Sequence, residues 1–296
     1  MTRLRRSILV LPADNRKMME KAANVDADVV QIDLEDAVDE TRKLAARQVV
    51  VECLRTLDYH GAERGVMINS MHGRWGAGDI ETTIVARPDV YFIPKVKSVA
   101  DVLEVDGLVT KLEHKHGLPG GNVKLIAILE QAEGIINARE IARSCPRLNA
   151  IVCGSEDVVA DIGATRTDDN RELAWAIAYV ALCAGAARVD ALQFPVMAWK
   201  DLDRLEHEAR EAAILGYAGK IAINPGQIAT LNRVFSPSPE QVAKARAIVD
   251  NFERSRQAGG AIIKHDSQMM DAPHVKQAMN VLEKARRAAQ SRGNAA

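Results

Sequence analysis

Short apolar runs recur along the chain, and stretches with helical spacing separate them. Runs such as Val29–Ile32 and Lys124–Leu129 are apolar at most successive positions instead of alternating with polar residues. A strand buried on both faces has that pattern, which is typical of parallel sheets covered by helices. The runs predict eight strands, at Ser7–Leu11, Val29–Ile32, Gly65–Ile68, Val90–Ile93, Lys124–Leu129, Ala150–Cys153, Val189–Leu192 and Lys220–Ile223.

Helical periodicity fills the segments between these strands. It predicts helices at Asn15–Ala23, Glu40–Leu57, Val99–His116, Ala132–Ser144, Asp169–Ala187 and Asp201–Leu215. Strands that alternate with helices form βαβ units and a parallel sheet. Eight such units fit an α/β fold, the (β/α)₈ TIM barrel. A doubly wound open sheet is the alternative, but no GxGxxG motif opens a helix after a strand.

The pattern changes after Ile223. Ser236–Pro239 predicts a linker, Glu240–Arg256 predicts a helix, and a last helix ends near Arg287. We therefore predict two parts, a barrel catalytic domain over residues 1–235 and a C-terminal helical extension over residues 236–296. The extension is either a packing appendage or a lid.

The charge balance argues against several classes of protein. The chain has 39 Lys and Arg against 40 Asp and Glu, whereas nucleic-acid-binding proteins usually carry a basic excess. No apolar run approaches the ~18 residues of a membrane span. The first apolar stretch ends at Pro12, too early for a signal peptide. The four cysteines form no CxxC pair, which favours a reduced, cytoplasmic protein without a zinc site.

Residues that could carry chemistry lie where the predicted strands end. A (β/α)₈ barrel has its active site at the C-terminal ends of its strands. Three of these ends are acidic, which is the most specific signal among them. The polar residues that end strands are Asp14, Asp33 with Glu35 and Asp36, Asn69, Lys95, Glu130, Glu156 with Asp157, and Asn224.

Glu130 and Asp157 follow two consecutive strands, and neighbouring strands lie about 4.8 Å apart. Two carboxylates at that spacing repel unless a cation or a proton lies between them. Mg²⁺ is commonly held by one or two carboxylates, with waters and substrate oxygens completing its shell. No histidine is placed to join them, which disfavours zinc. The alternative is that both carboxylates simply occupy helix N-termini.

The second strand ends in a run of three carboxylates. Asp33, Glu35 and Asp36 either line the site or form a charged strand exit that is paired with Lys43 or Arg47. Both interpretations fit the sequence pattern.

A small basic group lies near the first strand and the helix that follows it. Arg6 and Lys21 could contact the phosphates of a nucleotide-bearing cofactor, although such a group is more often a solvated surface. No GxSxG, P-loop or HExxH motif is present, so the sequence gives no support to the chemistry of those motifs.

Longer motifs follow one another in a fixed order from Arg5 to Ala278. They are Arg6–Pro12, Asp33–Val38, Pro94–Lys95, Glu130–Gly134, Gly154–Asp157, Leu215–Lys220, Asn224–Ile228 and Met270–His274. In this order they resemble the citrate lyase β-subunit-like branch of the HpcH/HpaI aldolase/citrate lyase superfamily. That branch contains malyl-CoA, citramalyl-CoA and citryl-CoA lyases.

The resemblance implies a (β/α)₈ barrel with a C-terminal lid, assembled as a homotrimer or homohexamer. It implies that Glu130 and Asp157 bind Mg²⁺. It also implies that Asp271 of the lid acts as general acid and base in a neighbouring subunit. Arg6 and Lys21 match the basic residues that help to hold CoA.

The resemblance further implies Mg²⁺-dependent cleavage of a carbon–carbon bond in a 3-hydroxyacyl-CoA, such as malyl-CoA or citramalyl-CoA. The expected partners are this CoA thioester and a small oxo acid, with no nucleic acid and no membrane. We expect Glu35 to be a second catalytic residue. We expect Asn69, Lys95 and Asn224 to bind substrate.

Three positions depart from the family pattern. Met67 stands where members usually have an arginine that stabilises the enolate or a substrate carboxylate, and Arg74 or Arg166 could replace it. Lys97 and Asn224 stand in place of a glutamate and a histidine. We therefore predict an altered substrate. The alternatives are a catalytically weakened, lyase-like protein that binds a CoA ester, and a pyruvate aldolase that acts on free acids.

Overall fold

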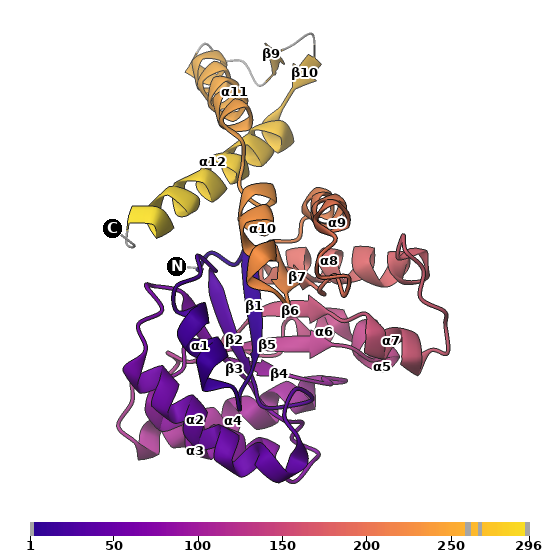
Figure 1. Cartoon of the computed structure of the whole chain (residues 1–296). Helices are drawn as coiled ribbons and strands as arrows, with labels where there is room; N and C mark the ends of the chain where they lie inside the picture. Colours follow the sequence, from indigo (N-terminus) through magenta and orange to yellow (C-terminus); the bar gives the residue numbers. More distant parts are fainter. Residues whose placement is uncertain (1–2, 258–261, 266–267, 294–296) are drawn as a thin grey trace. The chain divides into compact units, whose positions relative to one another are not determined.

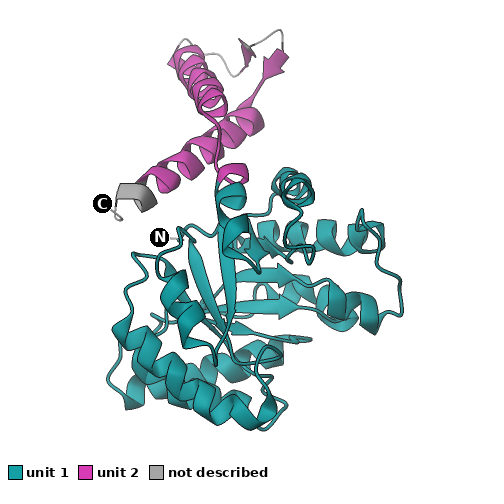
Figure 2. Cartoon of the chain, in the orientation of Figure 1, with its two compact units in different colours: residues 1–232 teal, residues 233–296 magenta. Residues whose placement is uncertain are grey.

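The computed structural model of the chain describes residues 3–257, 262–265 and 268–293. The chain divides into two compact units, residues 1–232 and 233–296 (Figure 2). This division lies close to the boundary that the sequence predicts after residue 235.

The first unit is a closed barrel of eight parallel strands, each paired with its neighbours in chain order (Figure 1). The first strand closes the barrel by pairing with both the second and the eighth. The predicted (β/α)₈ barrel is confirmed, and each predicted strand overlaps an observed one. The strands are β1 (Ser7–Pro12), β2 (Val29–Asp33), β3 (Glu63–Met67), β4 (Val90–Ile93), β5 (Lys124–Leu129), β6 (Leu148–Cys153), β7 (Asp190–Gln193) and β8 (Gly219–Ala222).

Helices follow the strands and cover the outside of the barrel (Figure 1). The helix predicted over residues 132–144 is broken at Asn137, whose Nδ2 donates a 2.8 Å hydrogen bond to the carbonyl oxygen of Lys97. The α-helices are α1 (Arg16–Ala22), α2 (Lys43–Thr56), α3 (Gly76–Thr83), α4 (Val99–Lys115), α5 (Ala132–Ile136), α6 (Ala138–Ile141), α7 (Glu156–Asp161), α8 (Ala174–Ala187), α9 (Leu202–Leu215) and α10 (Ile228–Val234). Short 3₁₀ turns are η1 (Glu40–Arg42), η2 (Ile84–Ala86), η3 (Arg171–Leu173) and η4 (Pro225–Gln227).

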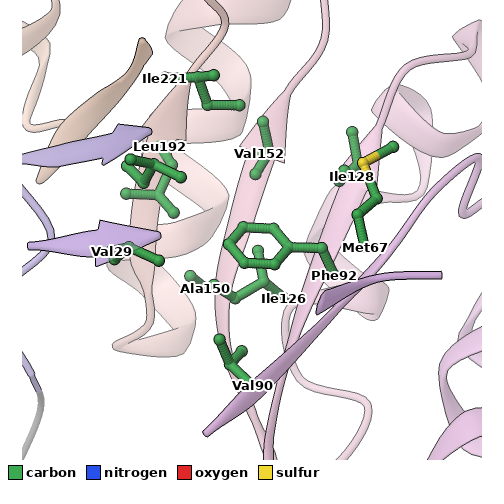
Figure 3. Packing of buried hydrophobic residues seen from close by; sticks show 11 residues of the cluster. Val29, Met67, Val90, Phe92, Ile126, Ile128, Ala150, Val152, Leu192 and Ile221 are labelled. Carbon is green, nitrogen blue, oxygen red and sulfur yellow. The ribbon is translucent and has the colours of Figure 1, made fainter. Parts of the chain in front are cut away.

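Apolar side chains from every strand fill the barrel interior (Figure 3). Phe92 is the largest of them, and it fits because the neighbouring strand has a glycine beside it. A Cβ at Gly65 would lie 2.6 Å from the Phe92 ring. The interior cluster is Ile8, Val29, Met67, Val90, Phe92, Ile126, Ile128, Ala150, Val152, Leu192 and Ile221.

Buried ion pairs occupy the N-terminal end of the barrel. Arg5, which precedes β1, donates hydrogen bonds of 2.6 and 2.8 Å to the carboxylate of Glu63 at the start of β3. Arg147, which precedes β6, contacts Glu113 of α4 at 3.0 Å. Removing one partner of such a buried pair leaves an uncompensated charge, which is strongly destabilising. The charges at this end therefore serve the fold.

The second unit is a pair of long helices with a short antiparallel ribbon between them in sequence. It contains α11 (Pro239–Gln257), β9 (Ile263–His265), β10 (Gln268–Met270) and α12 (Ala272–Gly293). Met270 is buried in a small apolar cluster of this unit with Ile248 and Val275. The two helices predicted after the linker are confirmed.

The four cysteines, Cys53, Cys145, Cys153 and Cys183, carry free thiols. Among the described residues, no helix has both the length and the apolar character needed to cross a membrane.

Candidate active site

Glu130 directly follows β5, at the mouth formed by the C-terminal ends of the strands. Its Oε1 accepts a 2.7 Å hydrogen bond from the backbone amide of Lys95, which lies just beyond β4. On the other side the chain after β6 passes very close, because residue 154 is glycine. A Cβ at Gly154 would lie 2.6 Å from the Cβ of Glu130. Glu130 is therefore held between the ends of β4 and β6, and only 8% of it is exposed.

Lys95 links Glu130 to the end of β2. Its Nζ donates a 2.5 Å hydrogen bond to Oε1 of Glu35 and lies 3.5 Å from Oδ2 of Asp36. Lys95 has a left-handed backbone with φ of 53°, a conformation that costs a non-glycine residue about 1–2 kcal/mol. Strain of this kind persists where surrounding contacts enforce it, as at many functional sites. One strained residue thus fixes the carboxylates of Glu35 and Glu130.

The carboxyl groups at this mouth hold protons more tightly than usual. Burial, together with the negative charges of Glu35 and Asp157, raises the pKa of Glu130 to about 8. Burial raises the pKa of Asp33 to about 7, although a hydrogen bond from the Glu35 amide opposes the shift. Burial also raises the pKa of Glu35, against the stabilising contact with Lys95. A cation bound among these groups would relieve the accumulated negative charge.

Asp157 lies in the first turn of α7 and is exposed. Its position in the first turn of α7 agrees with the interpretation that it occupies a helix N-terminus. Its negative charge also helps to raise the pKa of Glu130, which agrees with the interpretation that the two carboxylates share a cation. Within the described part of the chain, no three His, Cys, Asp or Glu side chains converge on one point. Mg²⁺ needs only one or two protein carboxylates, since waters and substrate oxygens complete its octahedron. Glu130 and Asp157 therefore fit Mg²⁺ as a donor set.

The buried carboxylate of Asp79 holds Asn69 in place. The backbone amide and Nδ2 of Asn69 donate to Oδ2 of Asp79 at 2.8 and 2.7 Å, and Nδ2 also donates to the Leu34 carbonyl oxygen. Arg47 binds the other carboxylate oxygen of Asp79 at 2.7 Å. The amide protons of Asn69 are thus committed to the fold, whereas Oδ1 accepts none of these hydrogen bonds. No local sequence pattern singles out Asp79.

The ion-pair alternative for the β2 exit is wrong. Lys43 donates to the backbone carbonyl oxygens of Leu34 and Glu35, each at 2.9 Å, and among the described residues it forms no ion pair with Asp33, Glu35 or Asp36. Arg47 pairs with a carboxylate from α3 instead. These contacts anchor the backbone after β2 and leave the Glu35 side chain to pair with Lys95.

Asn224 follows β8, so it belongs to the same barrel end. Its Oδ1 accepts a 2.8 Å hydrogen bond from the Gly226 amide and caps η4. The half-buried Asn224 side chain therefore keeps its Nδ2 for other partners.

The structure does not bring Arg6 to this mouth, which corrects its expected role in holding CoA. Arg6 precedes β1, so it lies at the N-terminal end of the barrel. Its guanidinium is 3% exposed and binds both carboxylate oxygens of Asp28, at 2.7 and 2.8 Å. Lys21 is exposed in the last turn of α1. Of the two expected CoA contacts, only Lys21 is accessible to a ligand.

Asp271 lies in the second unit, directly before α12. Its exposed carboxylate is 2.6 Å from Nδ1 of His274. The described contacts of Asp271 are within its own unit, so its role toward the barrel mouth stays a prediction.

Arg74 and Arg166, the two candidate replacements for the missing family arginine, are both paired with glutamates. Arg74 pairs with Glu40 at 2.5 Å and lies over the Trp75 ring. Arg166 pairs with Glu156 at 2.9 Å and also with Glu172.

Comparison with known proteins identifies the family. The HpcH/HpaI aldolase/citrate lyase family matches residues 6–225. The citrate lyase subunit beta of Leuconostoc mesenteroides is 34% identical over 281 residues, which cover 95% of this chain and 93% of that protein. A (3S)-malyl-CoA thioesterase of Cereibacter sphaeroides is 32% identical over 280 residues, which cover 95% and 94%.

Solved structures agree with this assignment. The protein CitE of Mycobacterium tuberculosis, in complex with magnesium, acetoacetate and coenzyme A, is 30% identical with a TM-score of 0.77. The match covers 94% of this chain and 97% of that one. A citrate lyase of Burkholderia xenovorans has a TM-score of 0.85 over 100% of this chain and 97% of its own, and at 18% identity it shows the fold alone. This chain therefore belongs to the HpcH/HpaI aldolase/citrate lyase family of enzymes.

Proposed function

We propose that this protein is a Mg²⁺-dependent carbon–carbon lyase that cleaves a 3-hydroxyacyl-CoA into an acyl-CoA and a small carbonyl product. One observation carries the proposal. Glu130 is held at the barrel mouth with a raised pKa, within the electrostatic reach of Asp157 and Glu35. In a malyl-CoA-like or citramalyl-CoA-like substrate, the carbonyl product would be an oxo acid.

Glu130 and Asp157 would hold the metal through carboxylate oxygens. A bound Mg²⁺ would supply Lewis-acid stabilisation of the negative charge that develops on substrate oxygens. The CitE relative forms a complex with magnesium, acetoacetate and coenzyme A, which supports the same ligand classes here.

The reaction divides between an acid–base group and fixed charges. The substrate hydroxyl gives its proton to a carboxylate, for which Asp271 of the second unit is the candidate. The bond between C2 and C3 breaks, C3 becomes a carbonyl carbon, and the electron pair stays with the acyl-CoA enolate. The enolate then takes a proton at C2. Lys95 would stabilise negative charge near the reacting carbons, because preorganised cations act strongly in a partly buried site, and Glu35 would orient its ammonium.

Asn69 and Asn224 are proposed to bind substrate through Oδ1 and Nδ2, respectively, the amide atoms that their structural hydrogen bonds leave available. Lys21 is proposed to contact CoA. A location in the cytoplasm also stays a prediction.

A homotrimer or homohexamer is proposed as the assembly, in which Asp271 would serve a neighbouring subunit. The outer face of α8 supports association with further copies of the chain. Trp175 and Leu182 are 63% and 70% exposed, and the Trp175 ring stacks on Tyr179 at 4.8 Å between centroids. Adjacent exposed apolar side chains on one helix face are typical of interaction sites.

The test is calorimetry of acetyl-CoA and propionyl-CoA with the wild-type protein and with Glu130→Ala. We expect Mg²⁺ together with a small aldehyde or oxo acid to strengthen binding of the CoA ester, and Glu130→Ala to abolish that gain. Binding that ignores the metal would instead favour a lyase-like protein without turnover. Absence of CoA-ester binding would contradict both and favour an aldolase acting on free acids.

A further inference from the structure

A pocket of about 360 Å³ lies at the N-terminal end of the barrel. Its wall includes residues at the starts of three strands, with Arg64 on β3, Asp89 before β4 and Lys124 on β5. The candidate active site lies beyond the C-terminal ends of the strands, and none of its expected residues lines this pocket. Pockets of roughly 300–1,000 Å³ commonly hold small molecules. The pocket is therefore a second candidate site, separate from the barrel mouth.

Seven charged residues line the pocket, and cations are in the majority among them. The cations are Arg3, Arg64, Arg87 and Lys124, and the carboxylates are Glu63, Asp89 and Glu113. A concave site lined by a surplus of one charge attracts ligands of the opposite charge. The pairing of the lining residues, which together are here called the basic pocket, decides which charges a ligand would meet.

Two of the carboxylates belong to the buried ion pairs that serve the fold. Glu63 is bound by Arg5, and Glu113 is bound by Arg147. Each of these guanidiniums also contacts a second carboxylate that does not line the pocket. Glu63 and Glu113 are therefore already neutralised from behind the wall of the basic pocket.

Asp89 is the third carboxylate, and two cations share it. Its Oδ1 accepts a 2.9 Å hydrogen bond from Nη2 of Arg3, and its Oδ2 accepts one of 3.0 Å from Nε of Arg64. One negative charge is thus set against two guanidiniums. The Arg3 side chain is 49% exposed, so it can turn toward a ligand.

Arg87 and Lys124 have no carboxylate partner among the described residues. The Lys124 ammonium donates a 2.8 Å hydrogen bond to the Gly121 carbonyl oxygen, which carries no compensating charge. The backbone of Arg87 is fixed, because its amide donates to the Ile84 carbonyl oxygen at 2.9 Å and its own carbonyl oxygen accepts from Arg64 at 2.7 Å. Two cations without a countercharge therefore line one pocket, and one of them extends from a fixed backbone.

We propose that the basic pocket binds a small organic oxyanion with two negative charges. Guanidinium groups bind two phosphate or carboxylate oxygens at once, and a lysine adds a compact positive charge. Leu118, Pro119 and Val123 line the same pocket and offer apolar surface to the carbon atoms of the ligand. A phosphate monoester and a dicarboxylate both have this chemistry. The proposal does not depend on the lyase function.

The test is calorimetry of the full-length protein, with Mg²⁺ present, using glycerol 3-phosphate and succinate as separate probes. We expect the wild-type protein to bind at least one of them, and the affinity to fall as NaCl is raised, because salt screens the attraction. The stronger of the two probes identifies the oxyanion. Glu130→Ala should bind the probe as tightly as the wild type does, since Glu130 lies at the opposite end of the barrel.

Arg87→Gly tests the first of the two unpaired cations, with Arg188→Gly as its matched control. Both arginines have a left-handed backbone, with φ of 55° and 60°, which glycine adopts without strain. Arg188 is exposed at the end of α8 and does not line the pocket. Arg87→Gly should raise the dissociation constant at least about tenfold, as for the loss of one charged hydrogen-bonding group, and Arg188→Gly should not. Neither should lower the thermal midpoint of the ligand-free protein, which separates binding from folding.

Lys124→Ala tests the second cation and should weaken binding by a similar factor. The exposed Lys115 of α4 lies outside the pocket, so Lys115→Ala is its control. Wild-type protein that binds neither probe would overturn the proposal. Wild-type affinity in both Arg87→Gly and Lys124→Ala would overturn it too. Loss of binding in Glu130→Ala would move the anion to the barrel mouth and have the same consequence.

Discussion

The backbone amide of Lys95 donates a 2.7 Å hydrogen bond to Oε1 of Glu130, and Lys95 holds a left-handed conformation while doing so. The same residue carries its ammonium to Glu35. Backbone strain and side-chain charge thus act at one position on two carboxylates from different strands.

These two contributions are separable by mutation. Lys95→Ala and Lys95→Gly both remove the ammonium, and each should reduce kcat by about 10²-fold or more, as expected when a preorganised charge is lost. Only Lys95→Gly also relieves the left-handed backbone, so it should be more stable than Lys95→Ala by about 1 kcal/mol. Denaturant unfolding measures the difference, and Lys97→Ala is the matched activity control. Equal stability of the two variants would contradict the strain.

The stability of the metal-free protein should depend on pH in a definite direction. Glu130 and Asp33 have pKa values of about 8 and about 7 in the folded protein, against usual values of 4.5 and 3.8. The folded state therefore binds more protons than the unfolded chain between about pH 4 and pH 8, and these groups contribute stability that falls as pH rises through that window. Mg²⁺ should raise the thermal midpoint more at pH 8 than at pH 5.5. An equal Mg²⁺ effect at both pH values would argue against this cluster as the metal site.

Glu130→Gln should isolate the contribution of Glu130. The amide keeps an oxygen for the Lys95 hydrogen bond but removes the charge that burial disfavours, so the metal-free variant at pH 8 should be at least as stable as the wild type. Its thermal midpoint should no longer respond to Mg²⁺. The exposed Glu133 of the same motif provides the control, and Glu133→Gln should retain the full Mg²⁺ response. Scanning fluorimetry measures both.

Gly154→Ala should disturb Glu130 by steric contact. The added methyl group would lie 2.6 Å from Cβ and 2.8 Å from Cα of Glu130, and overpacking of this kind costs roughly 1–3 kcal/mol. Gly107→Ala on α4 is the opposite case, since no atom lies within 4 Å of its Cβ. It should stabilise the helix by about 0.5–1 kcal/mol. A Gly154→Ala variant as stable and active as the wild type would show that the close approach is unimportant.

Leu182→Glu should weaken the proposed assembly. It puts a charge on the apolar outer face of α8, next to the stacked Trp175 and Tyr179 rings, where burial by another copy would become costly. Light scattering should show smaller particles with unchanged secondary structure. Leu44→Glu on α2, at a side chain that is 60% exposed, should leave the particle mass unchanged. If Leu182→Glu has the wild-type mass, α8 is not the interface.

The barrel could be predicted because its strands leave a strong local signal. Strands such as β5 are covered on both faces, so their sequence is apolar at consecutive positions. Short elements leave a weaker signal, and α3 and α10 are absent from the prediction for that reason. The break at Asn137 depends on a hydrogen bond to the distant Lys97 loop, which local periodicity cannot contain.

The candidate site was predictable to the extent that it follows from topology. Glu130 and Glu35 were expected at the mouth because each ends a strand. Arg6 is close to β1 in sequence, which suggested a contact with CoA. It precedes the strand, however, and therefore lies at the N-terminal end of the barrel, opposite the mouth. Asp79 was missed because its role depends entirely on tertiary contacts.

The hydrogen bond from the Lys95 backbone to Glu130 is invisible to ordinary mutagenesis of side chains. No side-chain replacement short of proline deletes a backbone amide. An alanine scan would therefore detect the loss of the Lys95 ammonium but not the contribution of its backbone hydrogen bond to Glu130. Testing that hydrogen bond requires an ester in place of the peptide bond at this position, introduced by chemical or semisynthetic means.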